Sequence, residues 1–282
     1  MNKAKQRGVA LAIVVWFIAG MSLLVAGIVS HARVDTQMAQ LHVARAKAAA
    51  AGDGAIQLMM AELATGKVPV PAAQGLPARV YRLGELEVAV NLVPATGLID
   101  LNGASAKILA ALFIIAGGLV EAEAQTVADN VVKWRSSSAK SSGRSTKTSR
   151  FAAMEDLLRV DGVSRTLLDA VRDYIVAGAP SQRGTNWSLA PEMVLAVLQQ
   201  ADPQKAGAAM RRRGRLPQSA TESGAGNRLA AVTVGSYRLD AVVRYGDKAW
   251  LRRRWVAMGM AASSSSLPWR MVRTEAPRVI DR

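Results

Sequence analysis

The sequence contains no cysteine and only two histidines among its 282 residues. A chain without cysteine forms neither a disulfide nor a thiol nucleophile. His31 and His42 both lie near the N-terminal apolar segment, which leaves no histidine elsewhere for a catalytic or zinc site. No nucleophile elbow, phosphate-binding loop or D-x-D-x-D loop occurs in the chain. We therefore predict a protein that is not an enzyme and that holds no metal or other cofactor.

The N-terminal leader also lacks acidic residues, although it carries Lys3, Lys5 and Arg7. An uncharged apolar run follows from Val9 to Ser30. As a helix this run spans about 33 Å, close to the thickness of the hydrocarbon core of a bilayer. The basic flank predicts a cytoplasmic N-terminus and an exported chain after the run. A secretory signal peptide is the alternative, but its apolar region is shorter and ends at a cleavage site. We favour a retained single-pass anchor.

The net charge is +15, which favours an anionic partner or surface. Much of this charge is local. Residues 133–150 contain only basic charges, and two arginine triplets occur at Arg211–Arg213 and Arg252–Arg254. The interpretation that we favour for all three is solvated loops and faces.

Apolar residues continue at steps of three and four beyond Ser30, which predicts that the same helix extends into the exported chain. Gly66 and the prolines after it mark the end of the helix. We divide this part into a leader at 1–8, a transmembrane half at 9–30 and an exported half at 31–66. The apolar stripe of the exported half needs a packing partner, either the chain's own globular domain or a neighbouring subunit.

Strand patterns flank a helical block. The sequence predicts a hairpin at 79–93 with its turn at Gly84–Glu85, and strands at 229–234, 237–245, 250–258 and 269–273. Turns are expected at Gly235–Ser236 and Gly246–Asp247. The predicted fold class is α+β: a long N-terminal transmembrane and amphipathic helix packed on an antiparallel sheet, with an inserted all-α domain. The α/β domain takes residues 67–99 and 217–282, and the inserted domain takes 100–216.

The helical block contains an internal repeat. The segment from Asp100 to Leu112 aligns with the segment from Asn186 to Leu198. Each has a short polar residue, another two positions on, then alanine and a helix with Leu-Ala-x-Leu. Short polar side chains cap the entrance of a helix, and Pro191 suits a first turn, so two similarly capped helices explain the pattern.

Residues 157–174 are similar to half of a helix-hairpin-helix. In DNA-binding versions a Gly-x-Gly turn presents backbone N–H groups to a phosphate. Here Gly162 is present, but Ser164 takes the second glycine position. The alternatives are DNA capture outside the cytoplasm and a protein-packing hairpin in which Ser164 caps the second helix. We favour the second, because a single motif match is weak evidence.

Together these features resemble the K-type minor pseudopilins (the GspK family) of the type II, or general, secretion pathway, from end to end of the chain. The leader resembles a prepilin peptidase site that is cut between Gly8 and Val9. Asp100, Asn102 and Ala104, and more loosely Asn186 and Ala190, match a pair of Asn-x-Asn-Thr-Ala-like segments. Glu155, Leu157 and Gly162 match the motif Glu-(Asp/Glu)-Leu-Leu-x-Val-x-Gly, and Trp134 matches the tryptophan of a Trp-Arg motif.

Most pilin-like proteins carry glutamate at the fifth mature position, where it neutralises the amino terminus of a neighbour; here that position is Ile13. An unpaired carboxylate inside a bilayer costs about 2.5–3.5 kcal/mol on insertion scales. A subunit at the tip has no neighbour above it, so the missing acid fits the K type in particular. The resemblance implies a periplasmic cap on the pseudopilus, anchored in inner-membrane lipid and assembled with the I- and J-type minor pseudopilins.

Two departures from the family matter. Calcium binding is associated with the family's helical domain and with acidic residues after Trp-Arg, but here serines and a basic loop at 136–150 follow. We therefore predict no calcium at this loop. Ser188 and Leu189 also stand where asparagine and threonine are expected. The alternative functions are a minor pilin of a type IV pilus and a membrane-anchored DNA-uptake receptor, although we do not expect a nucleic-acid partner.

Overall fold

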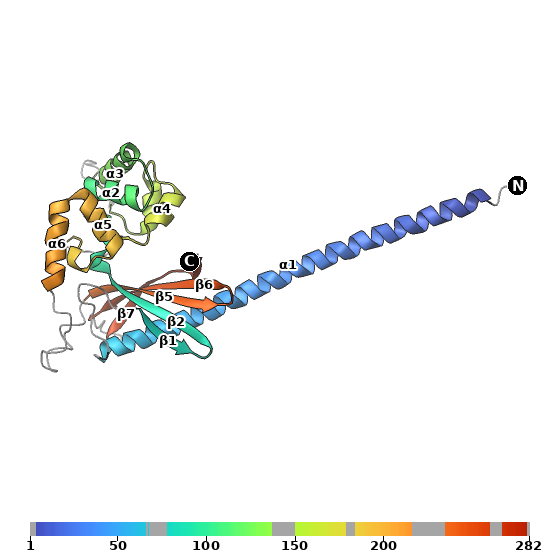
Figure 1. The fold of residues 1–282 in the computed structure, drawn as a ribbon, viewed down its shortest axis with the longest axis horizontal. Coiled ribbons are helices and arrows are strands. Elements are labelled where there is room, and N and C mark those ends of the chain that lie inside the picture. The colour runs from blue at the N-terminus through green and yellow to red at the C-terminus, as the bar shows by residue number, and fades with distance from the viewer. Residues whose placement is uncertain are drawn as a thin grey trace, which may run out of the picture. The chain divides into compact units, whose positions relative to one another are not determined.

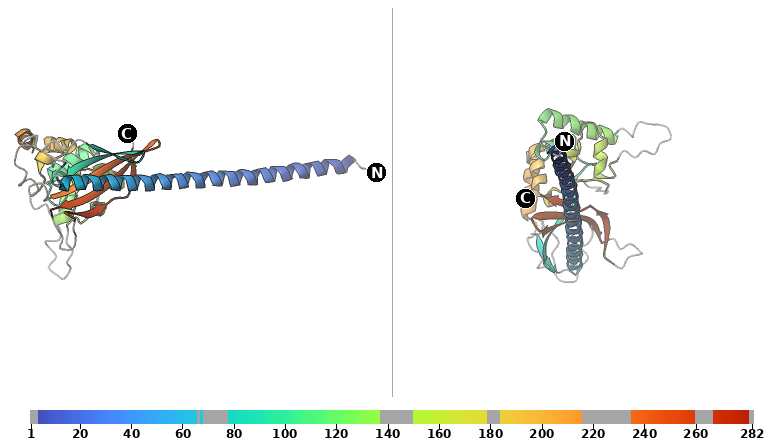
Figure 2. Two further views of the ribbon diagram at one scale, coloured as in Figure 1. Left: turned by 90° about the horizontal axis from the view of Figure 1, so that it is seen from below. Right: turned by 90° about the vertical axis from the view of Figure 1, so that its right-hand side faces the viewer.

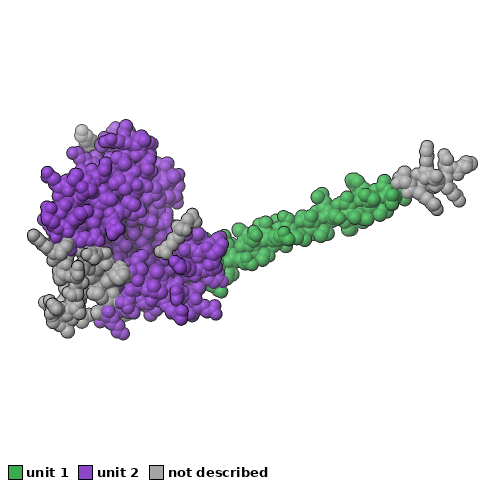
Figure 3. Space-filling model, in the orientation of Figure 1, with its two compact units in different colours: residues 1–50 green, residues 51–282 purple. Residues whose placement is uncertain are grey.

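The computed structural model describes residues 4–65, 67, 78–136, 150–178, 184–215, 235–259 and 267–280. It divides into two compact units, residues 1–50 and 51–282 (Figure 3). A single helix, α1 (Ala4–Ala64), begins in the first unit and ends in the second. The helix therefore already includes the last residues of the leader, and it ends two residues before Gly66.

The C-terminal part of α1 belongs to the core of the second unit. Ile56, Met59, Met60 and Leu63 are at most 1% exposed, and burying each contributes about 1.5–3 kcal/mol. This part of the helix lies along the sheet in both views of Figure 2. At Gly52 a Cβ atom would stand 2.7 Å from the Cβ of Arg252. A glycine that weakens the helix by about 1 kcal/mol thus permits close packing on the sheet.

An antiparallel sheet forms the other part of that core. Its strands are β1 (Arg79–Leu83), β2 (Leu86–Pro94), β5 (Gly235–Tyr245), β6 (Lys248–Met258), β7 (Trp269–Thr274) and β8 (Arg278–Ile280). The order is β1-β2-β5-β6-β7, and β8 also pairs with β6 (Figure 1). Gly84 (φ 61°) and Gly246 (φ 64°) form the predicted hairpin turns, where glycine accommodates a positive φ.

One predicted turn is wrong. Gly235 and Ser236 are the first residues of β5 and pair with Met258 and Ala257 of β6. The cross-strand ladder extends β5 through the glycine, which a local turn signal does not anticipate. The strand expected at 229–234 lies outside the described residues, and β8 was not predicted.

The inserted helices all come between β2 and β5, two strands that pair directly. They are α2 (Ala106–Ile115), α3 (Glu121–Ser136), α4 (Arg165–Val171), α5 (Glu192–Ala201) and α6 (Pro203–Arg215), with 3-10 turns η1 (Ala95–Gly97), η3 (Met154–Arg159) and η4 (Trp187–Leu189). A parallel pair of two-residue strands, β3 (Ile99–Asp100) and β4 (Ile175–Val176), adds a small sheet that the sequence did not predict. The predicted fold class, α+β, is confirmed.

Candidate functional site: anchor helix and inserted domain

The first unit is an apolar helical surface. Ile13 is 63% exposed and Trp16 is 83% exposed, and their neighbours from Leu11 to Val29 are similarly uncovered. An 18-residue window of this helix has a mean hydropathy of 2.5 with none of it buried, so the helix is long and apolar enough to cross a membrane. Gly8 and Val9 lie within the helix, as do Lys5 and Arg7, while Lys3 is outside the described residues. Such a surface is stable only against lipid or other apolar helices.

The first repeat, residues 100–135, is built around a loop that precedes α2. Asp100, only 4% exposed, accepts a hydrogen bond from the N–H of Asn102 at 2.9 Å. The Asn102 side chain holds Phe151 through two bonds: its Nδ2 donates to the Phe151 carbonyl at 3.1 Å, and its Oδ1 accepts from the Phe151 N–H at 2.8 Å. The two polar positions of the motif thus fold the loop and join it to a segment 49 residues away.

The Trp-Arg pair of α3 closes the same loop. Arg135 donates from Nη1 to the carbonyl of Leu101 at 2.7 Å and from Nη2 to that of Ala104 at 2.5 Å. Trp134 stacks on Phe151, with ring centroids 4.4 Å apart. Burial lowers the pKa of Arg135 from its usual value, and the charge of Asp100 opposes that shift. Asp100, Asn102, Ala104 and Trp134 therefore meet around two residues, Arg135 and Phe151.

The second repeat, residues 186–213, has the same frame. Asn186 accepts from the N–H of Ser188 at 3.2 Å, and Arg213 of α6 donates to the carbonyl of Ala190 at 3.2 Å. In both repeats the helix begins two residues after the alanine and has 10 residues. The two leucines of each Leu-Ala-x-Leu are buried. Ser105 caps α2 through its hydroxyl, whereas Pro191 stands at the N-cap of α5, one position before the predicted first turn.

The two arginines were not recognised as partners from the sequence. The Trp-Arg motif drew attention to Trp134, and Arg213 belongs to a triplet that was interpreted as solvated. Arg211 and Arg212 are exposed, as predicted, but Arg213 is half-buried. In each repeat the arginine lies in the second helix after the alanine whose carbonyl it binds. This equivalent position is the signal that the sequence offers for the two contacts, and it is not conspicuous in a single sequence.

The hairpin motif buries most of its leucines, whereas Gly162 and Ser164 of its turn are exposed. Leu157 is fully buried, and Gly162 (φ 88°) approaches α3 so closely that a Cβ would stand 2.8 Å from Cγ2 of Val127. The Ser164 hydroxyl accepts from the N–H of Leu167 at 3.0 Å, so Ser164 caps α4 as expected. The N–H of Val163 bonds the carbonyl of Val160 at 3.1 Å. The N–H groups of Val163 and Leu167 are thus bonded within the chain. Glu155 reaches Arg273 of β7 at 2.7 Å.

The arginine triplet of β6 corrects the expectation of solvated charge. Because side chains alternate along a strand, Arg252 and Arg254 face α1, where both bind Asp53. Arg253 faces the other side and is 2% exposed. Its partners are Asp240 at 2.6 Å and Asp173 at 2.5 Å. Charge that composition alone assigned to the surface is buried at Arg253 and half-buried at Arg252 and Arg254, in ion pairs that join distant segments.

No cluster of three or more metal-ligating side chains occurs within the described residues. Most of the basic loop, residues 137–149, lies outside them. The absence of calcium from this loop thus stays a prediction. The contacts of the site are intramolecular hydrogen bonds and ion pairs that join distant segments of the chain.

No protein-family profile and no curated protein matches the sequence. Among solved structures, the chain is similar to a chain in the crystal structure of the GspK-GspI-GspJ complex from the type 2 secretion system of enterotoxigenic Escherichia coli. The TM-score is 0.46 and the identity 13%, over 88% of this chain and 99% of that chain. A likeness at this level is too distant to assign a function.

Proposed function

We propose that this chain is a K-type minor pseudopilin of a type II secretion system, cut between Gly8 and Val9 and active through assembly. The observation that carries the proposal is the course of α1. This one helix begins with an uncovered apolar surface and ends as the core of an antiparallel sheet. The helical domain inserted between β2 and β5 supplies a bulky head, as the resemblance implies for a tip subunit.

Ile13 supports the tip position in particular. With isoleucine at the fifth mature position, the helix carries no carboxylate to neutralise the amino terminus of a subunit above it. In this proposal the helix rests in the inner membrane and later packs in the pseudopilus. The second unit lies in the periplasm with the I- and J-type minor pseudopilins as partners. Neither step needs a catalytic residue.

Two other functions share parts of this architecture. A minor pilin of a type IV pilus would have the same N-terminal membrane anchor but would belong to a different assembly. A DNA-uptake receptor would bind phosphate with the backbone N–H groups of the exposed turn at Gly162 and Ser164. One N–H group of this turn, that of Val163, is bonded to the carbonyl of Val160. Salt-sensitive DNA binding that is lost on substitution of Gly162 would favour the receptor.

The test is the N-terminal residue of the membrane-bound full chain, measured by mass spectrometry with and without prepilin peptidase. We expect Val9 with the peptidase and Met1 without it. Gly8→Val should block the cut, whereas Gly20→Val, which has open space around its Cβ, should not. An intact Met1 in both strains would overturn the proposal and return the chain to the receptor class. A cut beyond residue 25 would identify a secretory signal.

A second measurement addresses the K type. Co-purification of the processed chain with I- and J-type subunits of the same system should survive detergent extraction. Ile13→Glu should have one of two effects. If the new carboxylate pairs with the amino terminus of another subunit, further subunits should add to the tip end. If it stays unpaired, insertion of the helix into the membrane should fall. If both pseudopilus length and membrane insertion were unchanged, Ile13 would not support a position at the tip.

A further inference from the structure

The inserted domain has an apolar core of its own. This buried cluster extends from Ala95 to Ala209, and Trp255 is its one member from the described parts of β5 to β8. Ion pairs also join the inserted domain to these strands and to Glu275 between β7 and β8. Interfaces of this polar kind permit domains to move, whereas large apolar interfaces fix them.

Three arginines from three different strands converge on Asp173, just after α4. Nη1 of Arg253 (β6) donates to its carboxylate at 2.5 Å, and Nη2 of Arg278 (β8) does so at 2.8 Å. Nη1 of Arg238 (β5) donates to the carbonyl oxygen of Asp173 at 2.5 Å. On the sheet, Asp240 is the cross-strand partner of Arg253 and accepts from both Arg253 and Arg238.

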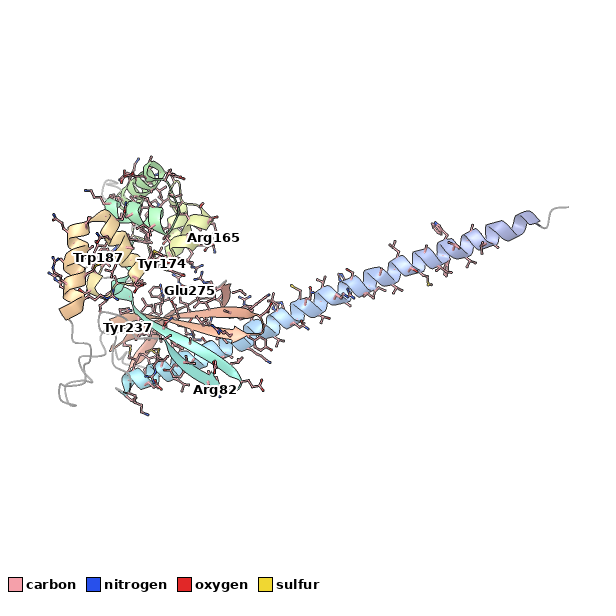
Figure 4. All side chains as sticks on the ribbon, in the orientation of Figure 1. Arg82, Arg165, Tyr174, Trp187, Tyr237 and Glu275 are labelled. Carbon is pink, nitrogen blue, oxygen red and sulfur yellow. The ribbon has the colours of Figure 1, made fainter. Side chains whose placement is uncertain are left out.

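The residue before Asp173 forms an ion pair of the opposite sense, with the cation on the inserted domain and the anion beside the sheet. Arg172 binds Glu275 at 3.1 Å, and Glu275 also accepts from Nε1 of Trp255 at 3.3 Å. Glu275 lies between the strands and the inserted domain in Figure 4. One dipeptide, Arg172-Asp173, thus supplies a cation and an anion to complementary groups on the sheet, and the Glu155–Arg273 pair adds a third connection.

We propose that Asp173 is the latch of the inserted domain: its charge fixes the domain on the sheet, and without that charge the domain undocks as an intact body. Removing one partner of a buried ion pair is strongly destabilising. Without the Asp173 charge, Arg253 and Arg238 keep Asp240 on the sheet, but they lose the negative charge that belongs to the inserted domain. Asp173 and Arg278 are 37% and 33% exposed, so water reaches the latch from one side.

Titration of the carboxylate follows from its neighbours. Burial raises the pKa of Asp173, but Arg253, Arg278 and Arg238 outweigh that effect and hold the pKa below its usual value. A lowered pKa means that the latch is closed above about pH 4 and opens as the pH falls through the lower, folded-state value. Other carboxylates lie at or beside the same groups and also titrate: Asp240, Glu275, Glu155 and Asp169. The contribution of Asp173 is therefore the difference in pH dependence between wild type and Asp173→Asn.

The test measures the distance between the inserted domain and the sheet. The chain has no cysteine, so Val120→Cys and Val80→Cys, at positions 69% and 64% exposed, accept spin labels selectively in the full chain in detergent. We expect one narrow distance distribution at pH 7 in the wild-type background and a broad one in Asp173→Asn. Asp129→Asn, an exposed aspartate bonded within α3, is the matched control and should stay narrow.

Amide exchange of α2 and α5 should remain as slow in Asp173→Asn as in wild type, because the inserted domain keeps all of its core except Trp255. A narrow distribution in Asp173→Asn would show that other contacts hold the domain and would overturn the latch. Fast exchange throughout α2 would assign Asp173 to the domain's own stability and would overturn it equally. The wild-type distribution should broaden below about pH 4 before α2 exchanges quickly, and simultaneous loss of both would also contradict the proposal.

Discussion

The two repeats of the inserted domain share a backbone plan but differ in reinforcement. Both have a side-chain-capped turn, an alanine, a ten-residue helix and an arginine that returns to the alanine carbonyl. In the first repeat Arg135 makes two bonds, Asn102 makes two more to Phe151, and an aromatic stack closes the loop. In the second, Arg213 makes one longer bond, and Trp187 is covered by Lys205 at 6.0 Å.

This difference explains why the second polar position of the motif is asparagine in the first repeat and serine in the second. Asn102 is needed because its side chain bonds both backbone groups of Phe151, whereas Ser188 enters its turn through its backbone N–H. A backbone donor makes no demand on residue type. The frame therefore survives in the second repeat with a different side chain, and the first repeat is the one that should be sensitive to substitution.

Substitutions of the aromatic side chains should give the largest difference in stability loss between the two repeats. Phe151→Ala should lower the free energy of unfolding by about 3–5 kcal/mol, because a fully buried ring leaves a cavity and Trp134 loses its stacking partner. Trp187→Ala should cost about 1 kcal/mol, since that ring is half-buried and its cation contact is long. Urea unfolding of the full chain measures both, and equal losses would abolish the contrast between the repeats.

The arginines should rank next. Arg135→Ala leaves the carbonyls of Leu101 and Ala104 without a charged donor and should cost about 2–4 kcal/mol. Arg213→Ala removes a single bond and should cost about 1 kcal/mol. Amide exchange in α2 against α5 locates each loss in its own repeat. Arg211→Ala, an exposed neighbour of Arg213, is the control and should change neither helix.

Local features of this fold were predictable from the sequence, because local signals determine them. The first arm of the hairpin predicted at 79–93 agrees with the bounds of β1, and Gly84 and Gly246 form the expected turns. The continuous α1 follows from its composition. These elements depend on neighbours within a few residues, which a single sequence displays.

The contacts that organise the inserted domain were not predictable in the same way. Arg135 finds Leu101 across 34 residues, and Arg253 finds Asp173 across 80. Composition placed the Arg252–Arg254 triplet on the surface because arginine is usually exposed. A strand that is covered on both faces can hold consecutive arginines in ion pairs on its two sides, but the sequence shows neither which strands are covered nor which carboxylates oppose them.

A smaller effect should separate the two polar positions of the motif. Asn102→Ala removes both bonds to the backbone of Phe151 and should cost about 1–3 kcal/mol. Ser188→Ala keeps the backbone N–H that bonds Asn186 and should stay within about 0.5 kcal/mol of wild type. Exchange of the Phe151 amide is the direct measurement. If Ser188→Ala were as costly as Asn102→Ala, the hydroxyl would have a role equal to that of the amide.

The smallest effect should come from the first polar position. Asp100→Asn keeps an oxygen for the N–H of Asn102 but removes the charge that opposes the lowered pKa of Arg135, so we expect a loss of about 1 kcal/mol. Asn186→Asp adds a charge at an exposed position and should stay within about 0.5 kcal/mol. Urea unfolding of both variants gives the comparison.

The cost of Asp100→Asn relative to Asn102→Ala tests whether hydrogen bonds or charge dominate in the first repeat. If Asp100→Asn cost more than Asn102→Ala, the electrostatic support of Arg135 would outweigh the hydrogen bonds that hold Phe151. The double variant Asp100→Asn/Arg135→Ala then decides between the two. A cost equal to that of Arg135→Ala alone means that Asp100 acts through Arg135, whereas an additive cost means that it acts through the turn.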